Sequence, residues 1–395
     1  MTSFSATPEQ SLESPYYIGI MSGTSLDGVD AVLVDFGADA PALLQTFFCP
    51  YDDKLRERLL SLHHSGHDEL NRAAILSNQL SCLYAQAIQG LLKGADMAPG
   101  QIAAIGCHGQ TIRHCPEAGK NYTIQLVNAA LMAELTGITV IADFRSRDIA
   151  AGGQGAPLVP AFHEAVFKSS DYRRVIVNIG GIANITRLDP HLPVIGFDCG
   201  PGNLLMDAWC LRYTGRIYDQ DGQWAATGQV IPVLLETLLA DSFFMREPPK
   251  STGRDLFNMH WLEQKLSGYE APENVQATLL QLTAAAIAGS IHAYCPAADE
   301  IYLCGGGAHN TLLLDRLSVG MPGKRVALTD QLGVAADWVE AFAFAWLAQQ
   351  TMLRKTGNLA AVTGAKGGLF MMFLQRKQEG GERIRRGFGD SRTVQ

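Results

Sequence analysis

Residues 18–30 read IGIMSGTSLDGVD, and they predict two strands joined by a polar turn. Apolar residues 16–21 predict a short buried strand, residues 22–28 a turn, and residues 29–36 a returning strand rich in Val, Leu and Phe. The turn offers hydroxyls, glycines and carboxylates, which can bring backbone N–H groups to phosphate oxygens and a carboxylate to a divalent cation. Ordinary hairpin turns use the same residue types, so this tip alone leaves both interpretations open.

The same strand-glycine-strand pattern occurs a second time, about 155 residues further along the chain. Residues 175–179 and 182–188 are apolar strands on either side of Gly180 and Gly181. A third glycine tip, at residues 305–307, follows another apolar strand and precedes a helix. Three glycine tips favour a ligand-binding role over chance turns, and the repeated pattern indicates two related halves.

Helices are expected to alternate with these strands. Residues 69–93 carry apolar side chains at helical spacing, with Asp68 as a plausible N-cap. Short strands are expected at residues 102–105 and 140–142. The alternation predicts an α/β protein with mixed sheets, in which ligands bind beyond the carboxyl ends of the strands.

Composition excludes several classes of protein. The chain has 395 residues, of which 47% are hydrophobic and 18% charged, as expected for a globular protein of about two domains. Its 39 acidic and 31 basic residues give a net charge of −8, so nucleic acid is not expected as a partner. The chain has forty glycines, roughly a tenth of its residues against a usual 7% or so. Clustered glycines indicate places where the backbone closely approaches another group.

The cysteines and histidines predict neither disulfides nor a zinc site. Eight scattered cysteines include no C-x-x-C pair, and the cluster of His63, His64 and His67 lacks further ligands at metal spacing, so a solvated turn is favoured there. No apolar run is long enough to span a membrane, and residues 1–15 lack a secretory signal pattern. A cytoplasmic protein with reduced thiols and no membrane partner is expected.

A candidate base lies in the segment GFDCGPGNLLMDAW. A strand is expected to end at Asp198, followed by a turn over residues 199–202 that includes Gly200. A helix then runs over residues 203–213 with Asn203 as its N-cap. This arrangement would set a carboxylate beside the exposed N–H groups of a helix N-terminus, which suits proton transfer and anion binding. The alternative is that Asp198 only helps to cap the helix.

Two further segments carry polar side chains suited to ligands. GCHGQTIRH, at residues 106–114, follows a short strand and could hydrogen-bond a polyhydroxylated ligand through His108, Gln110, Thr111, Arg113 and His114. The segment at residues 142–160 suits an interdomain hinge or an active-site loop. There Arg145, Arg147 and Asp148 could bind a carboxylate or phosphate, or pair with one another within the domain.

The predicted domain organisation has two bodies and two tails. Its parts are a flexible tail at 1–15, a first domain at 16–150 rejoined by part of 365–375, a second domain at 151–364, and a flexible basic tail at 376–395. An anion-binding arm is the alternative for that last tail. Neither G-x-x-x-x-G-K-[ST] nor G-x-G-x-x-G occurs, so a nucleotide would be held by some other arrangement.

Taken together, seven segments resemble the anhydro-N-acetylmuramic acid kinases. They are IGIMSGTSLDGVD (18–30), GCHGQTIRH (106–114), ADFRSRDIAAGGQGAPLVP (142–160), NIGGIANIT (178–186), GFDCGPGNLLMDAW (196–209), KSTGRDLFN (250–258) and LCGGGAHN (303–310). They follow the family's order over nearly the whole chain. The sequence departs from the family after residue 365, where KGGLFMMFLQRKQEGG and a basic tail replace the usual ending.

This resemblance implies a two-domain sugar kinase/Hsp70/actin-like fold with duplicated mixed-sheet cores and an interdomain ATP cleft that opens and closes. It also implies ATP and Mg²⁺ as cofactors, small-molecule substrates and a homodimer. The implied reaction hydrolyses the 1,6-anhydro bond of 1,6-anhydro-N-acetylmuramate at C1 and phosphorylates O6, during peptidoglycan recycling. The alternatives are a kinase of the same fold that acts on another amino sugar or anhydrosugar, and a nucleotide-switched binding protein.

Carried onto this sequence, the resemblance assigns roles to particular residues. Asp198 matches the base that deprotonates the attacking water, and Asp27 is the candidate for holding Mg²⁺. The ATP and phosphate set is Gly23, Thr24, Ser25, Leu26, Asp27, Gly28, Val29, Asp30, Gly180, Gly181, Gly305, Gly306 and Gly307. The substrate set is His108, Gln110, Thr111, Arg145, Gly200 and Asn203.

Overall fold

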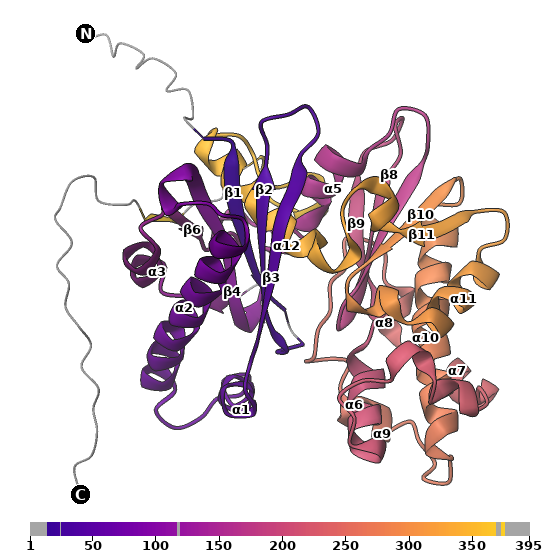
Figure 1. Cartoon of the computed structure of the whole chain (residues 1–395). Coiled ribbons are helices and arrows are strands. Elements are labelled where there is room, and N and C mark those ends of the chain that lie inside the picture. Colours follow the sequence, from indigo (N-terminus) through magenta and orange to yellow (C-terminus); the bar gives the residue numbers. More distant parts are fainter. Residues whose placement is uncertain (1–13, 24, 117–118, 369–372, 376–395) are drawn as a thin grey trace, which may run out of the picture.

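The structure is a computed structural model that describes residues 14–23, 25–116, 119–368 and 373–375. Its strands form two mixed sheets, one in each of two lobes that lie side by side (Figure 1). The predicted tails lie outside the described residues, apart from Ser14 and Pro15, and so does Thr24. No helix in the described part of the chain combines the length and the apolarity that crossing a membrane requires.

The first sheet is built from the N-terminal part of the chain. Its described strands, in spatial order, are β12 (Phe373–Gln375), β6 (Val140–Ala142), β4 (Ile102–Cys115), β1 (Tyr16–Ser22), β2 (Gly28–Asp35) and β3 (Ala42–Pro50). Strand β5 (Tyr122–Leu126) pairs with the outer part of β4. Strands β1, β2 and β3 are antiparallel neighbours, whereas β4 runs parallel to both β1 and β6.

The second sheet repeats this arrangement. Its spatial order is β11 (Arg325–Leu328), β10 (Glu300–Cys304), β7 (Arg174–Ile179), β8 (Ile182–Leu188) and β9 (Ile195–Pro201). Strands β7, β8 and β9 are antiparallel neighbours, and β10 runs parallel to β7 and β11. With strands β5 and β12 set aside, both sheets therefore place a three-stranded meander beside two parallel strands in the same order. The predicted α/β fold with duplicated mixed-sheet cores is confirmed.

Helices cover both faces of each sheet. The described helices are α1 (Asp53–Leu60), α2 (Glu69–Gly94), α3 (Ala129–Thr136), α4 (Ser146–Ala150), α5 (Val159–Phe167), α6 (Leu204–Thr214), α7 (Pro232–Leu239), α8 (Ser242–Met245), α9 (Met259–Glu263), α10 (Pro272–Tyr294), α11 (Thr311–Gly320), α12 (Val339–Met352) and α13 (Ala360–Thr363). Helices α2 and α3 bury the outer face of the first sheet in a core of their own. Helices α5 and α12 belong to a larger core that takes apolar residues from both sheets.

Helix α12 packs directly on β1, β2 and β4, although it follows the second sheet in the chain (Figure 1). Two glycines permit this contact: Gly19 and Gly106 are register partners on β1 and β4. A Cβ on Gly106 would stand 2.0 Å from the carbonyl oxygen of Phe344, and one on Gly19 would stand 1.8 Å from that of Ala341. We therefore propose that α12 belongs to the first domain. Apart from α12, we keep the proposed division into residues 16–150 and residues 151–364.

Several local predictions were wrong. Strand β4 continues through Cys115, so GCHGQTIRH lies within a strand, because β5 extends the pairing beyond the main sheet. Residues 146–150 form helix α4, where an irregular hinge or loop was expected. Asp68 precedes α2 in a left-handed conformation and makes no N-cap hydrogen bond, although α2 itself matches the expected helix closely.

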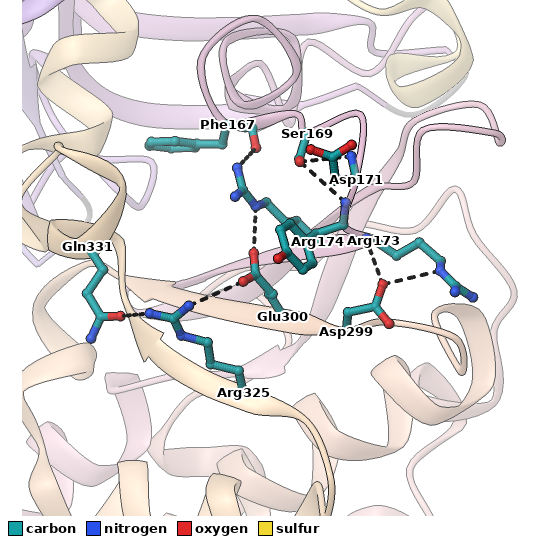
Figure 2. Close-up of polar contacts among 10 residues, drawn as sticks. Phe167, Ser169, Asp171, Arg173, Arg174, Asp299, Glu300, Arg325 and Gln331 are labelled. Atoms are coloured by element: carbon teal, nitrogen blue, oxygen red, sulfur yellow. Dashed lines mark hydrogen bonds and ion pairs between the residues drawn. The ribbon is translucent and has the colours of Figure 1, made fainter.

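A network of charged residues ties the second sheet together at the amino ends of its parallel strands (Figure 2). Glu300, only 6% exposed, accepts a hydrogen bond from Arg174 Nε at 2.8 Å and pairs with Arg325 Nη1 at 3.4 Å. The three residues are register partners on β7, β10 and β11. Both guanidinium groups also lie within 6 Å of the ring centre of Tyr302. This network, which we call the Glu300 clasp, joins β7, β10 and β11 at the end of the sheet opposite the glycine tips.

Glu300→Ala is expected to lower the free energy of unfolding by about 3 kcal/mol, because Arg174 would keep a largely buried charge with no carboxylate beside it. Urea unfolding followed by circular dichroism measures this. The matched control is Asp299→Ala, which removes the neighbouring, more exposed pair with Arg173 and should cost less than about 1 kcal/mol. If both variants lost the same free energy of unfolding, the Glu300 clasp would not stabilise the sheet as described.

Candidate active site

The first glycine tip is held to β4 by Gln110. Ser22, the last residue of β1, donates to Gln110 Oε1 at 2.5 Å, and Gln110 Nε2 donates to the carbonyl oxygen of Gly23 at 3.0 Å. Gln110 is fully buried, and its carboxamide connects β4 to both ends of this Ser22–Gly23 segment. Asp27 accepts from Ser25 Oγ at 2.6 Å and from the N–H of Gly28 at 3.0 Å. Gln110 thus fixes the backbone of the tip, a role that the sequence did not indicate.

The second tip is bound to the start of α6. The carbonyl oxygens of Gly180 and Gly181 accept the N–H groups of Gly202, Asn203 and Leu204 at 2.8–3.2 Å. The expectation that all these N–H groups would be exposed for an anion was therefore wrong. Asn203 makes no side-chain cap hydrogen bond, and its Oδ1 instead lies 2.6 Å from the position that a Cβ of Gly307 would take. The tip, the helix start and the third glycine turn thus form one unit.

Seven of the eight glycines nominated from sequence, all except Gly181, fall into two groups. For Gly23, Gly180 and Gly306, no atom lies nearer than 3.4 Å to a built Cβ, so a Cβ there would make only ordinary van der Waals contacts. The others are in close contact with protein. These are Gly28 against Cys49 and Phe48, Gly200 against Phe244, Gly305 against Asn178, and Gly307 against Ile179. The backbone of the first group is therefore less crowded by protein than that of the second.

Asp198 lies within β9, which continues through Pro201, so the expected strand end at this residue was wrong. The register skips Cys199, which makes it the extra residue of a β-bulge. Asp198 Oδ2 accepts the N–H of Thr252 at 2.8 Å, while its own N–H donates to the carbonyl oxygen of Lys250 at 3.1 Å. Burial raises the pKa of the Asp198 carboxyl to about 7, against the opposing effects of the Thr252 N–H and of Arg145 and Lys250. A carboxyl with this pKa is suited to accept a proton near neutral pH.

Arg145 connects the Asp198 region with β4. Its Nε donates to His108 Nε2 at 3.1 Å, and its Nη1 donates to the carbonyl oxygen of Gly155 at 2.7 Å. Burial, reinforced by Arg145, lowers the pKa of His108 to about 3, so the imidazole stays neutral and carries its proton on Nδ1. That buried Nδ1 has no hydrogen-bond partner among the described residues. Arg145 makes no ion pair with a carboxylate in the described part of the chain.

The remaining nominated side chains have structural partners. Thr111 Oγ1 accepts from Gln125 at 3.2 Å, and His114 Nδ1 lies 3.1 Å from Thr123 Oγ1. Arg113 pairs with Glu69 at 2.7 Å. Asp148 is fully buried and accepts hydrogen bonds from Gly155, Asn358 and Thr363 at 2.7–2.8 Å, which fixes the loop that follows α4.

An acidic group beside the first tip includes a residue that the sequence interpretation missed. Burial raises the pKa of Asp30 to about 8, with further contributions from Asp27, Glu340 and Asp337. Glu340, in the first turn of α12, has a pKa raised by burial and hydrogen-bonds Asn178. The sequence did carry a signal for Glu340, because it is the one acidic residue in the largely apolar helix α12. Lys250 and Thr252 were also missed, although KSTGRDLFN had been noticed.

Comparisons with known proteins identify the family. The family model described as anhydro-N-acetylmuramic acid kinase matches residues 15–372. A protein of that name from Nitrosospira multiformis is 61% identical over 356 residues, which cover 90% of this chain and 97% of the relative. Those from Nitrosomonas europaea and Chromobacterium violaceum are 61% and 54% identical, each covering 89% of this chain and 97% and 96% of the relative. The chain therefore belongs to the anhydro-N-acetylmuramic acid kinase family.

Proposed function

We propose that this kinase transfers the γ-phosphoryl group of ATP to O6 of 1,6-anhydro-N-acetylmuramate while water opens the anhydro bond at C1, with Asp198 as the base. The product is N-acetylmuramate 6-phosphate. The observation that carries the proposal is Asp198 itself: one carboxylate oxygen is fixed by the Thr252 N–H, and the pKa of the carboxyl is about 7. Family membership supplies the substrate.

In the proposed step, Asp198 takes a proton from water as the water oxygen bonds to C1. The C1–O6 bond breaks, and O6 forms its new bond to the γ-phosphorus as ADP leaves. An inverting glycosidase needs a second carboxylic acid to protonate the leaving oxygen. Here the leaving O6 bonds to the γ-phosphorus instead of taking a proton, so no second carboxylic acid is needed and one carboxyl near C1 suffices. Asp198 later returns its proton to solvent.

The phosphates of ATP are proposed to lie over the less crowded backbone at Gly23 and Gly180, with Gly306 on the adenosine side. Backbone N–H groups stabilise charge on transferring phosphates without having to reorganise. Ser25, Leu26 and Val29 belong to the same proposed set through the first tip, and Gly181 through the second.

The acidic group at the first tip suits Mg²⁺. Burial and the mutual repulsion of Asp27, Asp30 and Glu340 favour a cation there, as the raised pKa values of Asp30 and Glu340 indicate. The described residues include no group of three or more His, Cys, Asp or Glu spaced to hold a metal unaided. Mg²⁺ commonly keeps several waters and binds through one or two carboxylates and the substrate phosphates. Asp27 or Asp30 would hold it, and it would neutralise phosphate charge during transfer.

Arg145 is proposed to bind the lactyl carboxylate of the sugar, because its donors face neutral acceptors and no carboxylate is paired with it among the described residues. The Nδ1–H of His108 would then donate to a sugar oxygen. We further propose a cytoplasmic homodimer whose lobes close over the substrates, since closure keeps competing water from the γ-phosphate.

The reaction is tested by mass spectrometry of products formed from ATP, Mg²⁺ and 1,6-anhydro-N-acetylmuramate in ¹⁸O-labelled water, with prompt quenching. We expect ¹⁸O in the C1 hydroxyl of N-acetylmuramate 6-phosphate and none in its phosphate group. Synthetic product incubated in the same water without enzyme corrects for exchange at C1. Turnover of another anhydrosugar with this sugar left untouched would favour the alternative kinase. Absence of any sugar turnover would overturn the proposal.

A further inference from the structure

Three polar side chains stand in a row across the second sheet and end at Asp198. In the strand register, Asn178 of β7 pairs with Asn184 of β8, and Asn184 pairs with Asp198 of β9. Cross-strand partners point to the same face, with their Cβ atoms about 4.5–5.5 Å apart. Asn184 and Asp198 are therefore adjacent residues on the same face of the sheet.

The β-bulge in β9 creates this pairing. Ala183 pairs with Gly200, and the next residue, Asn184, pairs with Asp198, so Cys199 is passed over. An unbroken register would set Asn184 opposite Cys199, which is fully buried in the core. Bulges beside active sites commonly redirect one side chain. In this sheet the bulge brings two polar side chains to the same point on one face.

Asn184 carries an acceptor that no described residue uses. Its Oδ1 is buried and has no hydrogen-bond partner among the described residues. An unpaired buried oxygen is costly, and β-branched residues suit a strand better than asparagine does. Asn178 also has an unpaired Oδ1, but its side chain already binds Glu340. We therefore infer that the Asn184 Oδ1 accepts a hydrogen bond from a bound molecule next to Asp198.

A water that attacks carbon needs two acceptors to fix its orientation. It gives one proton to the base, and its second O–H can swing freely unless another acceptor holds it. Two acceptors that share one water at hydrogen bonds of about 2.8 Å lie roughly 4.5 Å apart. That separation fits neighbouring side chains on adjacent strands. With both O–H bonds held, a lone pair of the water points away from the sheet.

We propose that Asn184 is a positioning residue whose Oδ1 accepts the second O–H of the water that Asp198 deprotonates. This inference rests on the proposed role of Asp198. Asp198 takes one proton, Asn184 retains its hydrogen bond to the other, and the water oxygen forms the bond to C1 as the C1–O6 bond breaks. No proton is transferred to Asn184.

The test compares Asn184→Val with Asn184→Thr, which have nearly the same shape but differ in the hydroxyl acceptor. We expect Asn184→Val to lower kcat about 10- to 100-fold, with KM for sugar and ATP within about threefold, because the water is misplaced and the substrates are not. Asn184→Thr should recover at least about fivefold of that loss. The pH midpoint of the reaction should stay that of the wild type in both.

Thr186→Val is the folding control. Thr186 lies two residues further along β8 on the same face and is bound to His163 at 2.9 Å, away from Asp198. Its kcat should stay within about twofold of the wild type even if its melting temperature falls. The inference is overturned if Asn184→Val keeps wild-type kcat, if only KM rises, or if the valine and threonine variants are equally impaired. If Asp198→Asn is active, the proposed function fails first, which separates the two failures.

Discussion

Asp198→Asn is expected to lower kcat about a thousandfold while KM for ATP stays within about threefold. The carboxamide cannot take a proton from water, yet its oxygen can still accept the Thr252 N–H, so the local backbone is kept. The measurement is a steady-state assay of ADP release in the presence and absence of the sugar. A variant that keeps more than about a tenth of wild-type kcat would remove Asp198 from the reaction as its base.

The pH dependence supplies an independent check on the same residue. Because the carboxylate form of Asp198 is the active one, kcat/KM of the wild type should fall about tenfold per pH unit below a midpoint near 7 and level off above it, when measured at saturating Mg²⁺, which would keep Asp30 ionised. His108, with a pKa of about 3, is neutral across this range and does not contribute. A profile that stays flat from pH 5 to pH 8 contradicts the assignment.

Stability should change in the opposite direction to activity. The folded-state pKa of Asp198 is raised, so the wild type loses stability as pH rises from about 4 to about 7, and the full cost of the buried carboxylate is present above that window. Asp198→Asn removes this cost. The free energy of unfolding of the variant should exceed that of the wild type by roughly 4 kcal/mol at pH 8, with little difference near pH 4. Lost activity in a more stable protein cannot come from misfolding.

Gly106→Ala is expected to destabilise the protein by more than about 3 kcal/mol and to leave most of it insoluble. The added Cβ would stand 2.0 Å from the carbonyl oxygen of Phe344, which belongs to the backbone of α12 and cannot rotate away. Helix α12 would have to lift from β1 and β4, and Glu340 in its first turn would move with it. Soluble yield and urea unfolding measure the effect.

Gly289→Ala is the matched control for this substitution. Gly289 lies in α10, and a built Cβ there meets no atom within 4 Å. Alanine should therefore stabilise the helix by roughly 0.5–1 kcal/mol. If Gly106→Ala behaves like this control, then α12 does not pack against the first sheet as described.

Features that depend on neighbouring residues were readable from sequence. The apolar runs on either side of GTSLDG and of Gly180-Gly181 predicted the two hairpins, because a strand-turn-strand pattern is encoded within about twenty residues. The duplicated α/β fold followed from that repeat. Family motifs then pointed to the kinase family that the comparisons confirm.

Features that depend on residues far apart in the chain came only from the tertiary structure. The N–H of Thr252 reaches Asp198, and Arg145 reaches His108, across separations that no local pattern records. The bulge at Cys199, which sets Asp198 opposite Asn184, depends on the register between two strands and is invisible in either strand alone. Local spacing determines which elements form, whereas burial, strand register and close backbone approach determine which side chains share a site.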